Sequence, residues 1–145
     1  MVHSTKRLSK KSNTSPEYLR RYSRAVTRSL VVKATAGLDD PERCAQAFTV
    51  AATAAVSGVN VSLWLTGEAS WLAVPGRATE FQLPHSAPLP DLLAEILAVG
   101  TVTVCQQCAA RRNLTDQDLL PEVTISGAAV FVAEITQPDV QALVY

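Results

Sequence analysis

Short apolar runs of strand length alternate with segments of helical periodicity along most of the chain. The runs LVVKA (30–34), VNVSLWL (59–65) and TVTVC (101–105) are rich in β-branched residues and predict three strands. Two segments between them, 41–57 and 90–99, carry apolar residues every three or four positions, which predicts amphipathic helices. This alternation predicts an α/β domain with a mostly parallel sheet that is covered on both faces.

The ends of these two helices carry signals of their own. Asp40 is a favourable N-cap, and Pro41 suits the first helical position, where the missing N–H has no intrahelical partner to lose. Gly58 follows the last apolar position of the first helix, while Pro90 and Gly100 bound the second helix. The helix boundaries are therefore predicted independently of the apolar periodicity.

The polar stretches between these elements differ in what they predict. Residues 68–74 suit a short helix, whereas residues 75–90 form a loop with four prolines and no periodicity. Loops of this length are usually functional or lie at an interface. Residues 106–113 suit a short helix after the third strand, and Thr115 with Asp118 resembles a capping box.

Strand propensity is high throughout the C-terminal stretch, VTISGAAVFVAEITQPDVQALVY, so propensity alone leaves its structure ambiguous. The alternation earlier in the chain favours a strand at 123–125, a helix at 127–136 and a last strand at 140–145. With this division the sequence predicts five strands joined by helices.

Charge divides the chain of 145 residues into two parts. Residues 1–29 carry eight Lys/Arg and one acidic residue, whereas residues 30–145 carry five basic and twelve acidic residues. The first part is rich in Ser and Thr and poor in large apolar residues, so it cannot bury enough surface to offset its ordering entropy. We therefore predict a basic N-terminal arm over 1–29, disordered or partly helical, and one α/β domain over 30–145.

The arm has two candidate contacts. Clusters of Lys and Arg bind phosphate without a specific motif, so nucleic acid or an anionic surface is one of them. The sequence favours the other, an arm that stays in solution or lies on its own acidic body. No apolar run reaches the length of a membrane span, and the N-terminus lacks the apolar segment of a secretory signal. We expect no membrane partner and a cytoplasmic location.

Two cysteines lie where the third strand meets the next helix. Cys105 ends the strand, and Cys108 lies in the first turn of the helix. Ligands of parallel sheets bind beyond the carboxyl ends of the strands, and unpaired N–H groups at a helix start favour thiolate over thiol. The pattern indicates a reactive Cys105, with Cys108 as a weaker candidate for an assisting or resolving thiol. The alternative is that both are small, inert residues packed against the sheet.

Other uses of the cysteines are less well supported. A CxxC pair alone is a poor zinc signal, because a structural site needs four ligands and the sequence has no second CxxC and no HxxxH; we expect no metal. Three cysteines cannot complete a disulfide framework, and cytosolic thiols are usually reduced. Thioredoxin-like disulfide exchange stays open, although thioredoxins carry their CxxC after an early strand. Cys44 lies on the apolar face of the first helix, which indicates a core position.

Polar residues from four segments are candidates to support the cysteines. They come from the loops after the first two strands, from the proline-rich loop and from the helix that bears Cys108: Asp39, Glu68, His85 and Arg111. Capping accounts for Asp40, the neighbour of Asp39, and a helix start accounts for Glu68, while loop histidines are mostly solvated. Arg111 and Arg112 suit the helix C-terminus, an anionic sulfur species or an acidic partner, with the first favoured. Trp64 and Trp71 are large apolar groups that suit a contact between subunits.

The chain resembles the DsrE/DsrF-like family, which includes the Tus-type sulfur-relay subunits, in four consecutive segments: LVVKATAGLDDPERCAQAFTVAATA, LTGEA, PLPDLLAEILAVGTVTVCQQCAARRNLT, and a closing helix and strand. The resemblance covers about residues 30–145 and no part of the arm. It implies a three-layer α/β/α fold with a five-stranded sheet, sulfur chemistry, and homo- or hetero-oligomers that are often trimers or hexamers. The cysteine that carries persulfide in active relay members matches Cys105, although some members lack it.

Sulfur handling is the function that the resemblance and the cysteines favour together. Cys105, as a thiolate, would accept sulfane sulfur from a donor protein's persulfide and pass it to the thiol of an acceptor protein. This chemistry requires no cofactor, and we expect none. Two alternatives stay open: a non-catalytic oligomeric binding module, and a thiol redox protein that uses Cys105 and Cys108. The sequence alone does not decide whether the protein is a sulfurtransferase enzyme.

Overall fold

The computed structural model describes residue 16 and residues 28–145, so the arm predicted over 1–29 lies almost entirely outside the described residues. Within them, five strands form one sheet in the order β4-β3-β2-β1-β5, and every neighbouring pair is parallel. The predicted α/β fold is confirmed. The strands are β1 (Ser29–Ala34), β2 (Asn60–Leu65), β3 (Thr101–Cys105), β4 (Val123–Ser126) and β5 (Val140–Val144).

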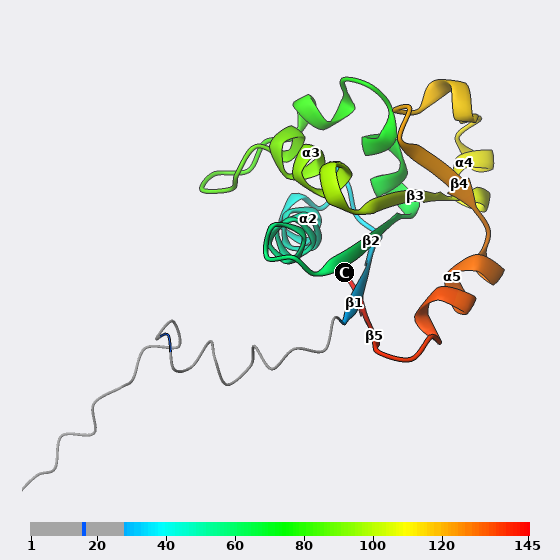
Figure 1. Ribbon diagram of the computed structural model, residues 1–145. Coiled ribbons are helices and arrows are strands. Elements are labelled where there is room, and N and C mark those ends of the chain that lie inside the picture. The colour runs from blue at the N-terminus through cyan, green and yellow to red at the C-terminus, as the bar shows by residue number, and fades with distance from the viewer. Residues whose placement is uncertain (1–15, 17–27) are drawn as a thin grey trace, which may run out of the picture.

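Helices lie on both sides of this sheet, which gives the predicted three layers (Figure 1). α2 and α3 pack together over one face, and α4 and α5 lie on the other side. Three short 3₁₀ helices, η1 to η3, fill the connections. The bounds of the helices are α2 (Pro41–Val56), α3 (Leu89–Val99), α4 (Gln106–Arg111), α5 (Ala128–Ile135), η1 (Gly67–Ala73), η2 (Arg77–Glu80) and η3 (Asp116–Asp118).

The local signals in the sequence account for both ends of α2. The carboxylate of Asp40 accepts the backbone N–H of Arg43 at 3.2 Å, which satisfies one of the free donors at the start of α2. Gly58 follows the end of α2 at a φ of +83°, a conformation that costs glycine little. The segment predicted as a loop over 75–90 contains one extra turn of helix, η2, because a single turn is too short to show a period.

One face of the sheet carries the hydrophobic core. Alternate residues of the central strands point toward α2 and α3, where they are closed off from solvent. Complete burial of each large apolar side chain stabilises the fold by about 1.5–3 kcal/mol. The largest of these residues, each less than 2% exposed, include Phe48 and Ile96 from the helices and Leu63, Leu65, Val102 and Val104 from the sheet.

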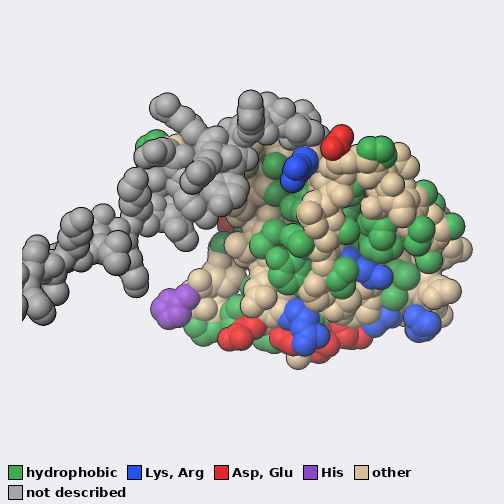
Figure 2. Space-filling model, turned by 90° about the horizontal axis from the view of Figure 1, so that it is seen from below, with side chains coloured by type: hydrophobic (Ala, Val, Ile, Leu, Met, Phe, Trp, Pro, Cys, Tyr) green, Lys and Arg blue, Asp and Glu red, His purple; other side chains and the backbone are tan. Residues whose placement is uncertain are grey.

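The opposite face of the sheet is covered more thinly. None of the residues of α5 is buried, and Val130 and Val132 are 53% and 52% exposed. Figure 2 views the molecule from below, where α5 and β5 lie lowest in Figure 1, and hydrophobic side chains are spread across this face. Among the described residues, no helix is long and apolar enough to cross a membrane.

Trp64 corrects one prediction. The sequence suggested that its side chain lies in a subunit contact, but Trp64 is only 2% exposed. The Phe131 ring of α5 packs edge-on against it at 5.1 Å between centroids, and the indole Nε1 donates to Glu134 at 2.7 Å. The tryptophan therefore attaches α5 to the sheet within the same chain.

Candidate functional site

Cys105 occupies the junction that the sequence predicted. It is the last residue of β3 and the N-cap residue of α4, and its backbone pairs with Ser126 of β4. The alternation of β3 places its side chain on the same face as Thr103, the face opposite the main core. The residue is half-buried, so its sulfur combines partial protection with access from solvent.

The surroundings of Cys105 favour its ionised form. Burial is the largest single influence and raises the pKa of the thiol, but four other influences together outweigh it. The pKa of the thiol is lowered below its usual value by the backbone N–H and the thiol of Cys108, by the backbone N–H of Gln107 and by the positive charge of Lys33. More of the sulfur is therefore thiolate at neutral pH than in an unperturbed cysteine.

The side chain of Cys108 is held by the turn after β2. It is buried, with 8% exposed, and the backbone N–H of Gly67 donates to its Sγ at 3.2 Å. Gly67 has a φ of +53°, and a β-carbon there would lie 2.6 Å from the backbone oxygen of Thr35. Only glycine fits this position, so the close approach that delivers the N–H depends on that residue type.

An ion pair closes the same turn. Glu68, which follows Gly67, accepts from Arg112 Nη2 at 2.6 Å, and Arg112 Nη1 donates to the backbone oxygen of Cys108 at 3.1 Å. The Arg112 guanidinium also lies over the ring of Trp71, 5.9 Å from its centroid. Glu68 is thus brought near the cysteines through Arg112, whereas the sequence indicated its neighbour Arg111 as the candidate.

Lys33 is the cation nearest to this chemistry that the sequence analysis missed. It lies in β1 on the thinly covered face, and its Nζ lies 4.7 Å from the centroid of the Phe131 ring. A cation held over an aromatic face keeps its charge on the side of the sheet that carries Cys105. The signal was present in the sequence, because Lys33 is the one charged residue in the apolar run LVVKA.

The other predicted supporting residues lie elsewhere or make no contact with the cysteines. Asp39 accepts the backbone N–H of Gly37 at 2.8 Å within the loop after β1, and its charge contributes to raising the pKa of Cys44. Arg111 is exposed, and no ion pair to it is found in the described part of the chain. These two residues are not brought together with Cys105 by any contact in the structure.

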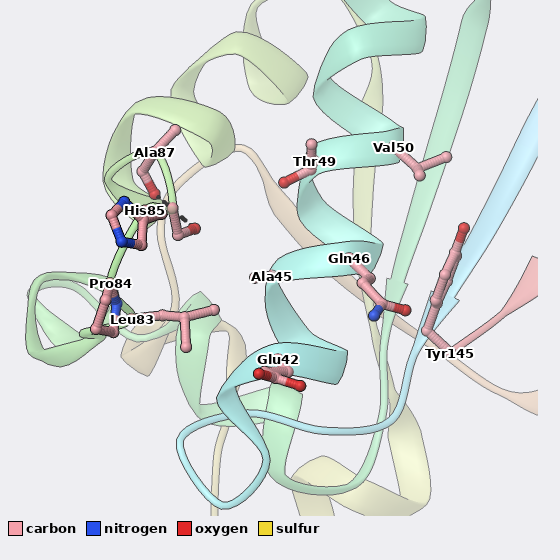
Figure 3. A pocket seen from close by; sticks show the side chains of 11 residues that line it. Glu42, Ala45, Gln46, Thr49, Val50, Leu83, Pro84, His85, Ala87 and Tyr145 are labelled. Carbon is pink, nitrogen blue, oxygen red and sulfur yellow. Dashed lines mark hydrogen bonds between the residues drawn. The ribbon is translucent and has the colours of Figure 1, made fainter.

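His85 lies at a different place in the fold. It lines a cavity of about 750 Å³ between the loop before α3 and the outer side of α2, with Glu42, Thr49 and Tyr145 also on its wall (Figure 3). Neither Cys105 nor Cys108 lines this cavity. Figure 1 shows the loop on the far side of the molecule from α4, so His85 is not brought to the cysteines.

The third cysteine contrasts with the pair. Cys44 has no exposed surface, and burial raises the pKa of its thiol to about 12, with smaller contributions from the charges of Asp39 and Asp40. It is a core residue, as predicted, and stays protonated and unreactive in the folded protein. Within residues 28–145, no three His, Cys, Asp or Glu side chains are grouped as a metal ion would require.

Comparisons with known proteins identify a family and a fold. The model of the DsrE/DsrF-like family matches residues 29–140. The uncharacterized protein MJ0760 of Methanocaldococcus jannaschii is 27% identical over 120 residues, which cover 81% of this chain but only 44% of the relative, so the chain spans less than half of that protein. Among solved structures, the ychN protein of E. coli superposes with a TM-score of 0.68 at 16% identity, covering 81% of this chain and 99% of ychN. MTH1491 of Methanobacterium thermoautotrophicum, a protein of unknown function, superposes with a TM-score of 0.56 at 10% identity over the same shares.

Proposed function

The chain belongs to the DsrE/DsrF-like family, and from that premise we propose that it carries sulfane sulfur on Cys105. The Cys105 thiolate attacks the outer sulfur of a donor persulfide, forms a new S–S bond and breaks the S–S bond of the donor. The donor leaves as a thiolate, and the proton of the outer sulfur stays with that sulfur. No external oxidant is needed, because the oxidised sulfur atom is transferred whole.

Delivery of the sulfur to an acceptor uses the same chemistry, with the Cys105 persulfide now acting as the donor. The thiolate of an acceptor protein attacks the outer sulfur of the Cys105 persulfide, and Cys105 is released again as a thiolate. A leaving thiol of lowered pKa departs faster, so the influences that favour thiolate at Cys105 assist both halves of the relay. Donor and acceptor proteins with accessible thiols are the partners that this cycle requires.

The observation that carries the proposal is the setting of Cys105. Cys105 is half-buried at the carboxyl edge of a parallel sheet, and its pKa is lowered despite the opposing effect of burial. Cys108 and Cys44 are both buried, so a donor protein meets them only after local opening. Of the three cysteines, Cys105 is the one that combines ionisation with access.

Intact-mass analysis after incubation with a sulfane-sulfur donor tests the proposal. Wild type should gain about 32 Da per transferred sulfur, and a reductant should remove it. Cys105→Ala should gain nothing, whereas the matched variant Cys44→Ala should behave as wild type. A gain of the same mass in Cys105→Ala, or none in wild type, would rule out transfer through this sulfur.

A thiol redox function is the second candidate. It is favoured by the spacing of the two free thiols, because Cys108 lies three residues after Cys105 in the first turn of α4, where small adjustments would allow a disulfide. Oxidation would then lower the mass of wild type by about 2 Da, reversibly, but would leave the masses of Cys105→Ala and Cys108→Ala unchanged. The two functions are separated by the sign of the mass change.

We also propose, from family membership, that the chain assembles with further subunits into a trimer or hexamer. The exposed valines of α5 and β5 supply the test, because a subunit contact on this side would cover them: Val130, Val132 and Val144. Light scattering should then show an oligomer in wild type and smaller species in Val132→Asp. A monomer in wild type, or an unchanged oligomer in the variant, would place this surface outside any assembly.

A further inference from the structure

Arg112 connects the helix that bears both cysteines to the turn that follows β2. One guanidinium nitrogen donates to the backbone oxygen of Cys108 at 3.1 Å, and another donates to Glu68 Oε1 at 2.6 Å. The Arg112 side chain is only 14% exposed, against 47% for Glu68. A short, charge-assisted pair with one shielded partner is held more firmly than a pair on the open surface.

The burial of Arg112 also carries a cost. Its Nε is buried and has no hydrogen-bond partner among the described residues. An unsatisfied buried donor destabilises the folded state by about 1–3 kcal/mol, a cost that an arginine pointing into solvent avoids. The two hydrogen bonds of the side chain, to Glu68 and to the backbone oxygen of Cys108, must therefore offset this cost.

The residue before Glu68 contacts the sulfur of Cys108. The N–H of Gly67 donates to Cys108 Sγ at 3.2 Å. Movement of Gly67 toward β1 is blocked, because the space beside its α-carbon is already occupied by the backbone oxygen of Thr35. Glu68 is held by Arg112 from the other direction, so the N–H is fixed between two constraints.

We infer that Arg112 and Glu68 are positioning residues that hold the Cys108 thiol next to Cys105, three residues earlier at the start of α4, where it can donate its hydrogen to the Cys105 sulfur. Because the Cys108 sulfur accepts from Gly67, its own hydrogen is directed away from that N–H. This inference rests on the proposed function, since it concerns how the sulfur-carrying thiolate is held. It adds Arg112 and Glu68 to the functional site, although neither contacts the transferred sulfur.

Glu68 gives a test that separates positioning from simple charge effects. By charge alone, removing the carboxylate would favour the Cys105 thiolate, because one nearby negative charge is lost. By positioning, the same change frees Arg112, loosens Gly67 and weakens the hydrogen bond from Cys108, so the thiolate is disfavoured. The two explanations predict opposite signs for Glu68→Ala.

The experiment measures the rate of alkylation of Cys105 by iodoacetamide against pH in the full chain, with peptide mapping to assign the modified cysteine. Glu68→Ala and Arg112→Met should each slow the reaction about threefold or more at neutral pH, because a charge-assisted hydrogen bond to the thiolate is weakened. Arg112→Met keeps an unbranched side chain of similar length while it removes the guanidinium, and circular dichroism checks that each variant is folded. Arg111→Met, the same change one residue earlier, is the control and should leave the rate within about twofold.

The path through Cys108 is tested by combining variants. In a Cys108→Ala background, Glu68→Ala should no longer slow the alkylation of Cys105, and only the charge effect, a faster reaction, should remain. Faster alkylation in Glu68→Ala with Cys108 present, unchanged rates in both variants, or slowing by Glu68→Ala that persists without Cys108 would overturn the inference. Alkylation needs no sulfur donor, so the positioning role of Arg112 and Glu68 can be disproved while the mass gain at Cys105 stands, and the reverse also holds.

Discussion

The two faces of the sheet differ in how fully they are buried and in the kind of side chain that they carry. Toward α2 and α3, strand residues such as Leu63 and Val104 have no exposed surface, and the contacts are almost purely apolar. Toward α5, the strands present Lys33, Thr103 and Cys105, and the covering helix has no buried residue. The first face is specified by packing, while the second face is held by a few directional contacts.

This difference separates stability from chemistry. A closed apolar face stabilises the fold in proportion to the surface that it removes from water, whatever reaction the protein performs. A thinly covered face leaves polar groups near solvent, where a thiolate can form and a partner can approach. The cysteines illustrate both environments, because Cys44 belongs to the closed face and Cys105 to the open one.

The largest expected effect comes from exchanging one phenylalanine on each face for alanine. Phe48 has no exposed surface, so Phe48→Ala should lower the free energy of unfolding by about 3–5 kcal/mol. Phe131 is only half-buried, so Phe131→Ala should cost about 1 kcal/mol. Denaturant titration measures both values. Equal losses would show that the face under α5 is packed as firmly as the main core.

The next effect is a pH dependence with opposite signs for two cysteines. The Cys44 pKa is raised from 9.0 to about 12, so its contribution to stability is full below 9.0 and is lost as pH rises toward 12. The loss is about 2 kcal/mol near pH 10.5. The Cys105 pKa is lowered, so its contribution is full above the unfolded pKa and is lost as pH falls through the folded pKa.

Unfolding free energies of wild type, Cys44→Ala and Cys105→Ala, compared across pH, measure these slopes. Cys44→Ala should remove part of the alkaline loss that wild type shows, and Cys105→Ala should leave that loss in place. Because tyrosines and lysines titrate in the same range, only the differences between variants count. Parallel curves for wild type and Cys44→Ala would mean that the buried thiol is not a stability determinant.

A smaller and more local effect is expected at the contact between α5 and the sheet. Glu134→Ala removes the acceptor of the buried Trp64 N–H and should cost about 1–2 kcal/mol. Hydrogen exchange should then accelerate in α5 more than in α2, because α5 has few other contacts. Glu122→Ala, at an exposed position before β4, is the control. Uniform acceleration throughout the sheet would contradict a separately attached helix.

The smallest effect concerns the charge of Lys33. Its positive charge is the last of the influences that lower the pKa of Cys105, so Lys33→Met should raise that pKa and slow alkylation at neutral pH. Added salt should reduce the difference between variant and wild type, because a half-exposed charge is screened. Arg43→Met removes the same charge from the start of α2 and should leave the rate unchanged. A salt-independent difference would indicate lost packing on Phe131 instead.

The sequence predicted what depends on local and periodic signals. Asp40 and Gly58 bound α2 through their own side chain and backbone preferences, which act without reference to the rest of the fold. The position of Cys105 followed from strand order alone, because every parallel strand delivers its last residue to one edge. These features need no knowledge of which residues meet across the sheet.

The remaining site residues depend on pairings that no local pattern encodes. Gly67 and Cys108 are 41 positions apart, and Arg112 meets Glu68 across 44 positions. The sequence suggested that Trp64 lies on the surface, because its cover comes from Glu134 of α5, 70 positions later. His85 was expected near the cysteines but lies in the cavity beside α2. Its loop is part of the connection between β2 and β3, but a loop of this length can extend away from the edge that carries the cysteines.

The neighbours of β1 have a consequence for synthesis. β1 pairs with β2 on one side and with β5 on the other, so the earliest strand of the described domain is completed by the latest one. A nascent chain on the ribosome therefore holds β1 with one backbone edge unpaired until residues 140–144 emerge. An unpaired edge is a template for wrong partners, so the interval before β5 emerges is the period of greatest exposure to misassembly.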